Sequence, residues 1–158
     1  MVEDNFSILA LPIADSIQHS LTSLLSQEAI EDAACCENSD LVEEHRFSAC
    51  GKFLVVHIPR FKLVNGVPLK DSRIVDACVD NLVVPVTMDD EVVIARPFKL
   101  LATINHSGTL NHGHYTSHVV DPANDSWWLC NDKAVTPITL PNLSNGNSTV
   151  FFYERSDT

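Results

Sequence analysis

The sequence has little positive charge. It contains 10 lysines and arginines against 21 aspartates and glutamates, which gives a formal net charge of −11. Nucleic-acid binding needs a basic surface for the phosphates, so this balance argues against a nucleic-acid partner. An acidic surface instead suits a basic partner, although acidity that only keeps the protein soluble is an equally simple explanation.

Long apolar runs are also missing. No stretch approaches the roughly 20 apolar residues of a membrane span, and the N-terminus has no basic segment followed by a long apolar one. We therefore expect a soluble, intracellular protein, cytoplasmic or nuclear, without a membrane partner. With 158 residues, 45% of them hydrophobic, the chain is long enough for one core, so we expect one domain over residues 1–158.

The five cysteines have no regular spacing and their number is odd. They do not predict a disulfide framework, and reduced thiols are the default. A structural zinc site uses two pairs of ligands, with about two to four residues between the members of each pair. Cys35 and Cys36 are adjacent, and Cys50 and Cys78 stand alone. We therefore expect no structural zinc, and no other metal or cofactor.

Near the N-terminus the apolar residues have helical spacing. A helix is predicted from Asp15, which can cap the first turn, with Gln18 three residues later. The apolar residues that share one face of this helix are Ile17, Leu21, Leu24 and Leu25. A second short helix is predicted to begin at Ser26 and to include Ala29 and Ile30.

Strands are predicted for most of the remaining chain. The run from Lys52 to Phe61 is almost continuously apolar, which is typical of a central strand covered on both faces. Asn65-Gly66 predicts a hairpin turn. The runs from Phe98 to Ile104 and from Tyr115 to Val120 flank a polar loop with two glycines, which predicts a hairpin with a wide connection. The final predicted strand is Thr149 to Tyr153.

The wide hairpin is where the sequence becomes chemically specific, because it carries His106, His112 and His114. A histidine whose ring N–H is accepted by an asparagine or aspartate oxygen forms the orienting pair of a nucleophilic site. His114 and Asn131 are candidates for such a pair. Turn residues from Pro122 to Ser126 separate them, so two adjacent antiparallel strands would bring the side chains together.

Two other interpretations use the same histidines. His112 and His114, at positions i and i+2, would share one face of a strand, and with His118 they could hold a catalytic zinc. No carboxylate partner is obviously spaced among them. The remaining interpretation is a glycine-rich hairpin with incidental histidines.

Three segments around these residues together resemble a known motif: Leu100–Gly108, Gly113–Val119 and Trp128–Thr136. They resemble the histidine box of the ubiquitin-specific proteases, which are papain-like cysteine deubiquitinases. The resemblance implies that His114 is the general base, that Asn131 orients it and that Asp132 supports the pair. It also implies that Gly113, Tyr115 and His106 line the path of the ubiquitin tail. One departure is Cys130, which stands where the family usually has an aromatic residue.

The resemblance extends from about Leu11 to Glu154 and corresponds to the second half of a family catalytic domain. The segment Leu54–Phe61 resembles a family strand that ends in an Arg-Phe pair, and Val150–Glu154 resembles the closing strand. We therefore expect an α+β fold, a papain-like remnant. In it an antiparallel sheet carries the His114 site, and one or two N-terminal helices pack beside it.

The family places its nucleophile in an N-terminal cysteine box at the start of a helix, and no such box stands in this sequence. Acidic neighbours would raise the thiol pKa of Cys35 and Cys36, and the other cysteines lie in or beside strand-like runs. Two functions stay open. The chain is part of a cysteine deubiquitinase that cleaves after the C-terminal glycine of ubiquitin, or it is an inactive pseudoenzyme that binds ubiquitin or another partner. The arginines of a ubiquitin tail suit the acidic composition.

Overall fold

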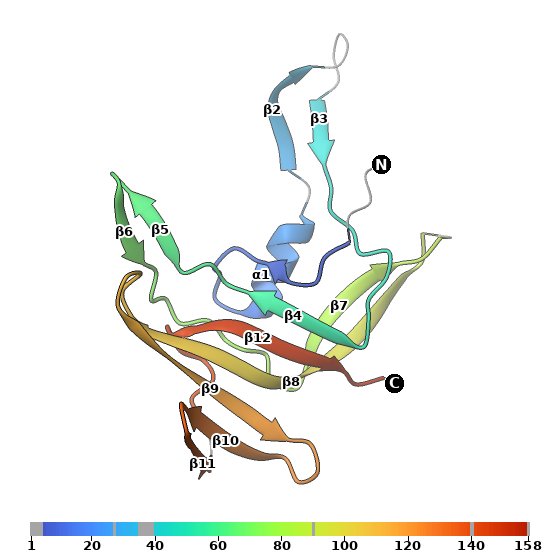
Figure 1. Cartoon of the computed structure of the whole chain (residues 1–158). Helices are drawn as coiled ribbons and strands as arrows, with labels where there is room; N and C mark the ends of the chain where they lie inside the picture. The colour runs from blue at the N-terminus through green and yellow to red at the C-terminus, as the bar shows by residue number, and fades with distance from the viewer. Residues whose placement is uncertain (1–4, 27, 35–39, 90, 140, 158) are drawn as a thin grey trace.

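The computed structural model describes residues 5–26, 28–34, 40–89, 91–139 and 141–157. In this part of the chain there is one helix, α1 (Ile17–Leu25), and the rest of the regular structure is sheet (Figure 1). The strands are β1 (Leu9–Ala10), β2 (Glu28–Ala34), β3 (Asp40–Glu43), β4 (Phe53–His57), β5 (Phe61–Val64), β6 (Val67–Lys70), β7 (Leu82–Thr87), β8 (Val93–Gly108), β9 (Gly113–Asp121), β10 (Ser126–Asn131), β11 (Ala134–Ile138) and β12 (Ser148–Arg155). The predicted α+β class is confirmed, with one helix among these residues.

Eight of the strands form one sheet. Its order is β1-β4-β12-β8-β9-β10-β11, and β7 pairs with β8 outside this path. β1 is parallel to β4, and the other pairs are antiparallel. Within the 16-residue β8, Phe98 pairs with both Arg155 of β12 and Leu82 of β7, so these two strands occupy opposite edges. β8 thus links the β7 arm to the histidine-bearing hairpin with β9 (Figure 1).

The core lies between α1 and one face of the sheet. Ile17 and Leu21 of the helix are buried together with apolar side chains from β4, β7, β8 and β12. The cap of α1 is Ser16, whose hydroxyl accepts a hydrogen bond from His19 N at 2.9 Å, so the predicted cap at Asp15 was wrong by one residue. Gln18 binds the backbone of Val83 instead, which ties the helix to β7. No helix in the described chain has the length and apolarity to cross a membrane.

The second predicted helix is wrong. Residues 28–34 form β2, which pairs with β3 in an antiparallel hairpin that projects from the sheet (Figure 1). Ala29 pairs with Val42, and Ile30 pairs with Leu41. An isolated helix of this length is unfavourable because nucleation is costly, so strand pairing prevails. Cys35 and Cys36, on which the zinc expectation was based, lie outside the described residues.

The predicted central strand is present as β4, between β1 and β12, but it is not covered on both faces. Leu54 and Val56 are buried against the helix side, whereas the side chain of Phe53 on the other face is 60% exposed. The reason is that α1 packs on one face of the sheet only, as the buried cluster shows.

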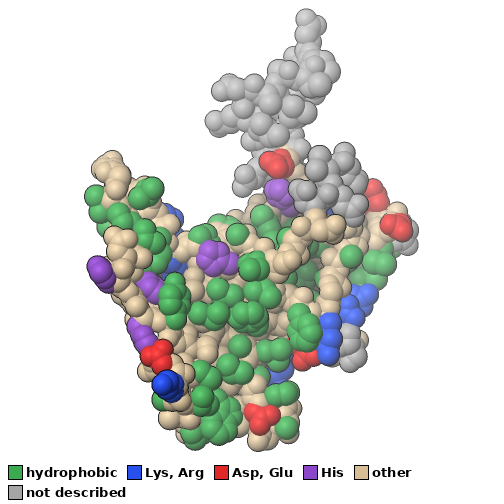
Figure 2. Space-filling model, in the orientation of Figure 1, with side chains coloured by type: hydrophobic (Ala, Val, Ile, Leu, Met, Phe, Trp, Pro, Cys, Tyr) green, Lys and Arg blue, Asp and Glu red, His purple; other side chains and the backbone are tan. Residues whose placement is uncertain are grey.

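The Asn65-Gly66 turn is confirmed, because both residues have positive φ angles, 51° and 79°, and they join β5 to β6. This hairpin stands away from the main sheet and exposes its apolar side chains, which appear as green surface at the upper left of Figure 2. The most exposed of them are Leu63, Val67 and Leu69.

Candidate active site

The histidine-bearing hairpin is formed by β8 and β9. His114 is the second residue of β9 and pairs with Ser107 of β8. Asn131 is the last residue of β10, the next strand of the sheet, and the β9–β10 pairing ends one residue before it, at Cys130. This arrangement brings His114 Nε2 to 2.6 Å from Asn131 Oδ1.

The contact determines which ring nitrogen of His114 can act as a base. A carboxamide oxygen only accepts hydrogen bonds, so Nε2 carries the proton and donates it to Asn131. The lone pair of the neutral ring is then on Nδ1, which has no hydrogen bond to any residue that the structure describes. Both residues are exposed, so a substrate or a second segment can reach Nδ1.

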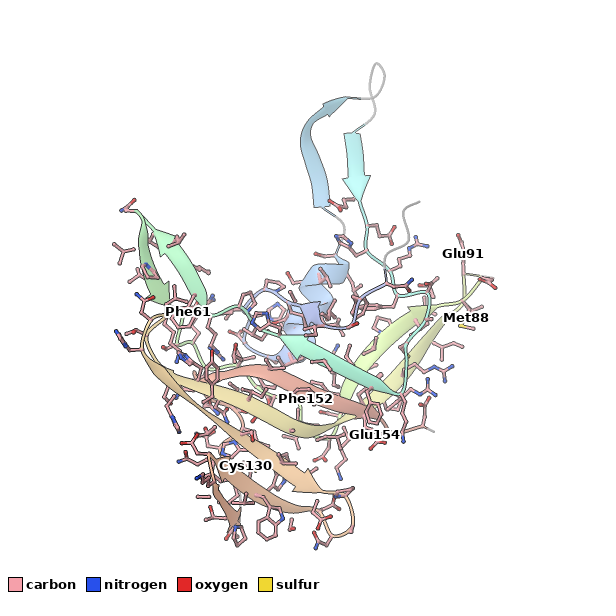
Figure 3. The ribbon with its side chains drawn as sticks, in the orientation of Figure 1. Phe61, Met88, Glu91, Cys130, Phe152 and Glu154 are labelled. Carbon is pink, nitrogen blue, oxygen red and sulfur yellow. The ribbon has the colours of Figure 1, made fainter. Side chains whose placement is uncertain are left out.

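His106 belongs to the β8 strand of this hairpin, where it pairs with Tyr115, and it is only 6% exposed. Its ring centroid is 4.7 Å from that of Tyr115 and 5.5 Å from that of Phe61, which Figure 3 labels at the start of β5. A Cβ atom on residue 113 would lie 2.0 Å from His106 Nε2. Gly113 is therefore required by this ring. Direct contact between the His106 ring and a bound tail does not fit its burial, whereas Gly113 and Tyr115 are exposed.

A lysine of the β5–β6 hairpin binds the backbone of β8 at His106. Lys70, the last residue of β6, donates hydrogen bonds from Nζ to the His106 carbonyl oxygen and to Asn147 Oδ1. His106 N donates to the Asn147 carbonyl oxygen at 2.9 Å. Burial, with a smaller contribution from the charge of Arg60, lowers the pKa of Lys70. The β5–β6 hairpin and the loop before β12 are thereby tied to the strand that carries the site.

A second polar network lies behind the hairpin, and the sequence did not indicate it. Ser148 Oγ donates to Asn105 Oδ1 at 2.6 Å, and Asn105 Nδ2 lies 3.3 Å from His118 Nδ1. Because the amide nitrogen only donates, His118 Nδ1 is the acceptor and this ring is neutral. Burial lowers the pKa of His118, which agrees with the neutral form.

Arg60 is the most deeply buried charged side chain of the described residues, at 2% exposure. Its guanidinium donates to four backbone carbonyls, those of Ser148, Asp71, Arg73 and Asn145, at 2.6–3.1 Å. Burial is the main cause that lowers its pKa. The arginine of the predicted Arg-Phe pair therefore joins two loops to the sheet and takes no part in the exposed site.

Comparison with known proteins identifies the family. The family model described as "Ubiquitin carboxyl-terminal hydrolase" matches residues 11–153. The chain belongs to the ubiquitin carboxyl-terminal hydrolase family. The predicted resemblance to ubiquitin-specific proteases is thus confirmed.

The relatives of this family member are longer than the chain. Human ubiquitin carboxyl-terminal hydrolase 2 is 28% identical over 175 residues, which cover 97% of this chain and 27% of the human protein. A probable ubiquitin carboxyl-terminal hydrolase of Acanthamoeba polyphaga mimivirus is 25% identical over 163 residues, which cover 94% of this chain and 34% of that protein. The chain therefore spans about a quarter to a third of the length of these two relatives.

Solved structures show the same fold. The SAGA Ubp8/Sgf11/Sus1/Sgf73 DUB module bound to ubiquitin aldehyde superposes with a TM-score of 0.83 at 22% identity, over 97% of this chain and 36% of that chain. A form of this module bound to monoubiquitin gives a TM-score of 0.74 at 20% identity, with the same coverage. At these identities the likeness establishes the fold, which this chain shares with about a third of each of those chains.

Two further residues that the sequence singled out, Asp132 and His112, lie outside the His114–Asn131 contact. Asp132 is exposed in the turn between β10 and β11 with a φ of 51°, and its side chain makes no hydrogen bond or ion pair to a described residue. His112 precedes β9 and so does not share a strand face with His114, contrary to the zinc interpretation. Across the described ranges, no group of three or more histidine, cysteine or acidic side chains is arranged to hold a metal ion.

The cysteines among the described residues are Cys50, Cys78 and Cys130, and all are free thiols. Cys130 is adjacent to Asn131 on β10 (Figure 3), and successive strand residues point to opposite faces, so its thiol lies on the face away from the His114 contact. Cys78 follows Asp76, whose carbonyl oxygen is 3.8 Å from its sulfur, and burial raises the thiol pKa. None of the three makes a hydrogen bond to His114.

Proposed function

We propose that this chain supplies the general base of a cysteine deubiquitinase that hydrolyses the peptide or isopeptide bond after the C-terminal glycine of ubiquitin. The observation that carries the proposal is the 2.6 Å contact between His114 and Asn131 in a member of this family. His114 Nδ1 takes the proton of the nucleophilic thiol and later gives it to the leaving amine. The Asn131 oxygen keeps the ring in the required tautomer and favours the imidazolium that forms.

The ubiquitin tail would approach along the exposed start of β9. Gly113 has no side chain there, so an extended peptide can come close to the backbone, and the exposed Tyr115 offers an apolar edge. Asp132 adds a negative charge two residues after Cys130, the last residue of β10 that pairs with β9. The formal net charge of the whole chain is −11. Both suit a tail that contains arginines. The bound ubiquitin in the similar DUB module structures supports this assignment.

The nucleophile of the proposed reaction is supplied outside the residues described here. Cys130 directs its thiol to the face away from His114, and burial raises the thiol pKa of Cys78, so neither is suited to attack. The thiol of Cys50 lies 4.0 Å from Arg155 Nη1 and makes no hydrogen bond to His114. The proposed partial domain, residues 1–158, would complete its site with a cysteine-bearing segment. The same observation favours a second candidate, a pseudoenzyme that binds ubiquitin and does no chemistry.

Hydrolysis of a ubiquitin C-terminal fluorogenic amide, measured beside a titration of unlabelled ubiquitin, tests both candidates. For the first, we expect turnover by the polypeptide that contains the nucleophile, with His114→Ala removing it and leaving the affinity for ubiquitin almost unchanged. Asn131→Ala should reduce the rate less than His114→Ala does. An unchanged rate in His114→Ala contradicts the assignment of the base.

Ubiquitin bearing a C-terminal electrophile distinguishes the source of the nucleophile. Mass spectrometry of the adduct identifies the cysteine that attacks. We expect no adduct with this chain alone and binding of unmodified ubiquitin. An adduct on one of its five cysteines would place the nucleophile within the chain, and binding without turnover in every form would favour the pseudoenzyme.

A further inference from the structure

Hydrogen bonds between side chains connect β9 to the loop before β12. Asn105 Nδ2 donates to His118 Nδ1 at 3.3 Å, and Ser148 Oγ donates to Asn105 Oδ1 at 2.6 Å. Asn105 and Ser148 are buried, at 5% and 0% exposure, and His118 is partly buried. The neutral ring of His118 accepts at one end, so every bond in this series has a fixed direction.

The loop continues the series back to β8. Ser148 Oγ also lies 3.2 Å from Asn145 Oδ1, an oxygen that accepts from Asn147 N at 2.7 Å and from Ser148 N at 2.9 Å. The Asn147 carbonyl oxygen accepts from His106 N at 2.9 Å. These residues together form the His118 network, which consists of His118, Asn105, Ser148, Asn145 and Asn147.

Protonation of His118 is incompatible with the present direction of these bonds. The charged ring carries a hydrogen on Nδ1, so two donors would face each other at Asn105 Nδ2. The hydroxyl of Thr103, at 3.5 Å from Nδ1, is at the limit of hydrogen-bonding distance. A half-turn of the Asn105 carboxamide removes the conflict, because it exchanges two groups of nearly equal size and presents Oδ1 to the ring.

The half-turn changes the role of Ser148. Its hydroxyl then faces the amide nitrogen of Asn105, so the oxygen accepts and the hydrogen turns to Asn145 Oδ1. That oxygen has two lone pairs and would serve three donors, which weakens its bond with Asn147 N. Asn147 is the residue that holds the backbone of His106.

We propose that the His118 network is a proton-operated switch, which loosens the contact between Asn147 and His106 when His118 is protonated. The buried groups of the network have hydrogen-bond partners in both arrangements, so the switch has two defined positions. Ser107 follows His106 on β8 and pairs with His114. The switch therefore acts on the hairpin that carries the candidate base.

The surroundings of His118 set the pH at which the switch operates. The neighbouring positions of β8 and β10 on this face of the sheet hold no ionisable side chain; they are Thr103, Asn105, Leu129 and Asn131. His114 lies four residues earlier on β9, and Arg60 reaches the network through the Ser148 carbonyl. Burial lowers the pKa of His118 from its ordinary 6.5. A folded-state pKa below the unfolded value means that the neutral arrangement holds at neutral pH. It is lost as the pH falls through the folded-state pKa.

Titration of the whole chain from neutral to mildly acidic pH, followed by nuclear magnetic resonance, tests the switch. At neutral pH, imidazole ¹⁵N spectra should show His118 with its proton on Nε2. As the pH falls, the side-chain amide signals of Asn105 and the backbone amide signal of Asn147 should shift with the midpoint of His118. Ser148→Ala removes the hydroxyl between them, so Asn105 should still follow His118 and Asn147 should not. Ser107→Ala, an exposed serine of β8, is the matched control and should behave as wild type.

Hydrogen exchange of the His106 amide measures the loosening itself, because this N–H donates to the Asn147 carbonyl. His118→Gln is the comparison variant, since a glutamine oxygen accepts from Asn105 at every pH. Below the midpoint, the His106 amide should exchange several-fold faster in wild type than in His118→Gln, and above it at the same rate. His19→Gln, at an exposed position of α1, should match wild type throughout.

Three results would overturn the proposal. The first is an Asn105 side-chain signal that stays constant while His118 titrates. The second is an Asn147 signal that follows His118 equally in wild type and in Ser148→Ala. The third is equal exchange of the His106 amide in wild type and His118→Gln at every pH. Ubiquitin takes no part in these measurements, so failure of the proposed function leaves the switch intact, and the reverse also holds.

Discussion

At the scale of single residues, the site hairpin depends on the absence of a side chain at position 113. Gly113 does not have a positive φ, so its role is packing against the His106 ring. We expect Gly113→Ala to destabilise the protein by roughly 1–3 kcal/mol, which is typical of overpacking a filled site. Urea unfolding measures the change. Gly51→Ala is the control, because its Cβ would meet only the Phe53 carbonyl at 3.8 Å, and it should stay within about 0.5 kcal/mol of wild type.

Asn131→Ala should change the tautomer of His114 more than it changes stability. The hydrogen bond is exposed, so its loss should cost at most about 1 kcal/mol. Without the Asn131 oxygen, the neutral ring is free to carry its proton on either nitrogen. Long-range ¹H–¹⁵N correlation spectra of the imidazole should then change from the Nε2–H form to a mixture. A spectrum identical to that of wild type would show that Asn131 does not orient the ring; Asn142→Ala is the control.

The His114–Asn131 pair could be predicted from sequence because it depends on short-range features. A hairpin, a turn and a third strand follow one another along the chain, and adjacent strands place such side chains together. Asn105 and Ser148 could not be paired in this way. They are 43 residues apart and meet because β12 returns to lie beside β8, which no local pattern specifies.

At the scale of elements, the Arg60 side chain joins the loop after β6 and the loop before β12 to the sheet. Replacement by methionine leaves four carbonyls without their donor in a buried place, and each unsatisfied buried group costs roughly 1–3 kcal/mol. We expect Arg60→Met to lower the free energy of unfolding by at least about 3 kcal/mol in urea titrations. Arg46→Met removes only an exposed pair with Glu44 and should change it by at most about 1 kcal/mol. Equal losses in the two variants would contradict this assignment.

Asp71, in the loop after β6, should make the free energy of unfolding fall as the solution becomes acidic. Hydrogen bonds from the Arg73 side chain, the largest cause, hold the pKa of Asp71 at about 2, below its ordinary 3.8. A folded-state pKa below the unfolded value stabilises the protein at higher pH, and this contribution is lost as the pH falls from about 4 to about 2. Arg73 is exposed, so solvent screening limits the effect to the order of 1 kcal/mol.

Asp71→Asn tests this dependence, because asparagine keeps an acceptor for the loop but does not titrate. Unfolding free energies of the variant, measured over the same pH range, should fall less steeply than those of wild type. Parallel curves would show that Asp71 is not the group responsible.

The sequence predicted helices and strands well where apolar residues recur at regular spacing. It predicted them poorly where a short strand is stabilised by pairing with another strand. α1 and the β8–β9 hairpin were predicted because their side chains repeat with a clear period. β2 was assigned as a helix because the stabilising interaction is its pairing with β3, which lies beyond the segment itself. The exposure of one face of β4 depends on which side α1 covers, and that is a property of the packing.

At the scale of the whole molecule, the net charge of −11 should affect how ubiquitin approaches, if the proposed function holds. An acidic surface attracts a basic tail over a distance that salt shortens. We expect the association rate of fluorescent ubiquitin, measured by stopped flow, to fall several-fold from low to physiological ionic strength, with a smaller change in the dissociation rate. An association rate that salt leaves unchanged would exclude this contribution.

The position of β12 in the sheet also has a consequence for the time course of folding. β12 follows all of its neighbours in the sequence, yet it lies between β4 and β8 in the middle of the sheet. Its pairing with β4 joins residues as far apart as Phe53 and Glu154, and such long loops are slow to close. On a translating ribosome, α1 can already bind β7 through Gln18 and Val83, but β4 and β8 lack the strand between them until β12 emerges. The edges of β4 and β8 that β12 covers are therefore expected to be exposed to chaperones until β12 has been synthesised.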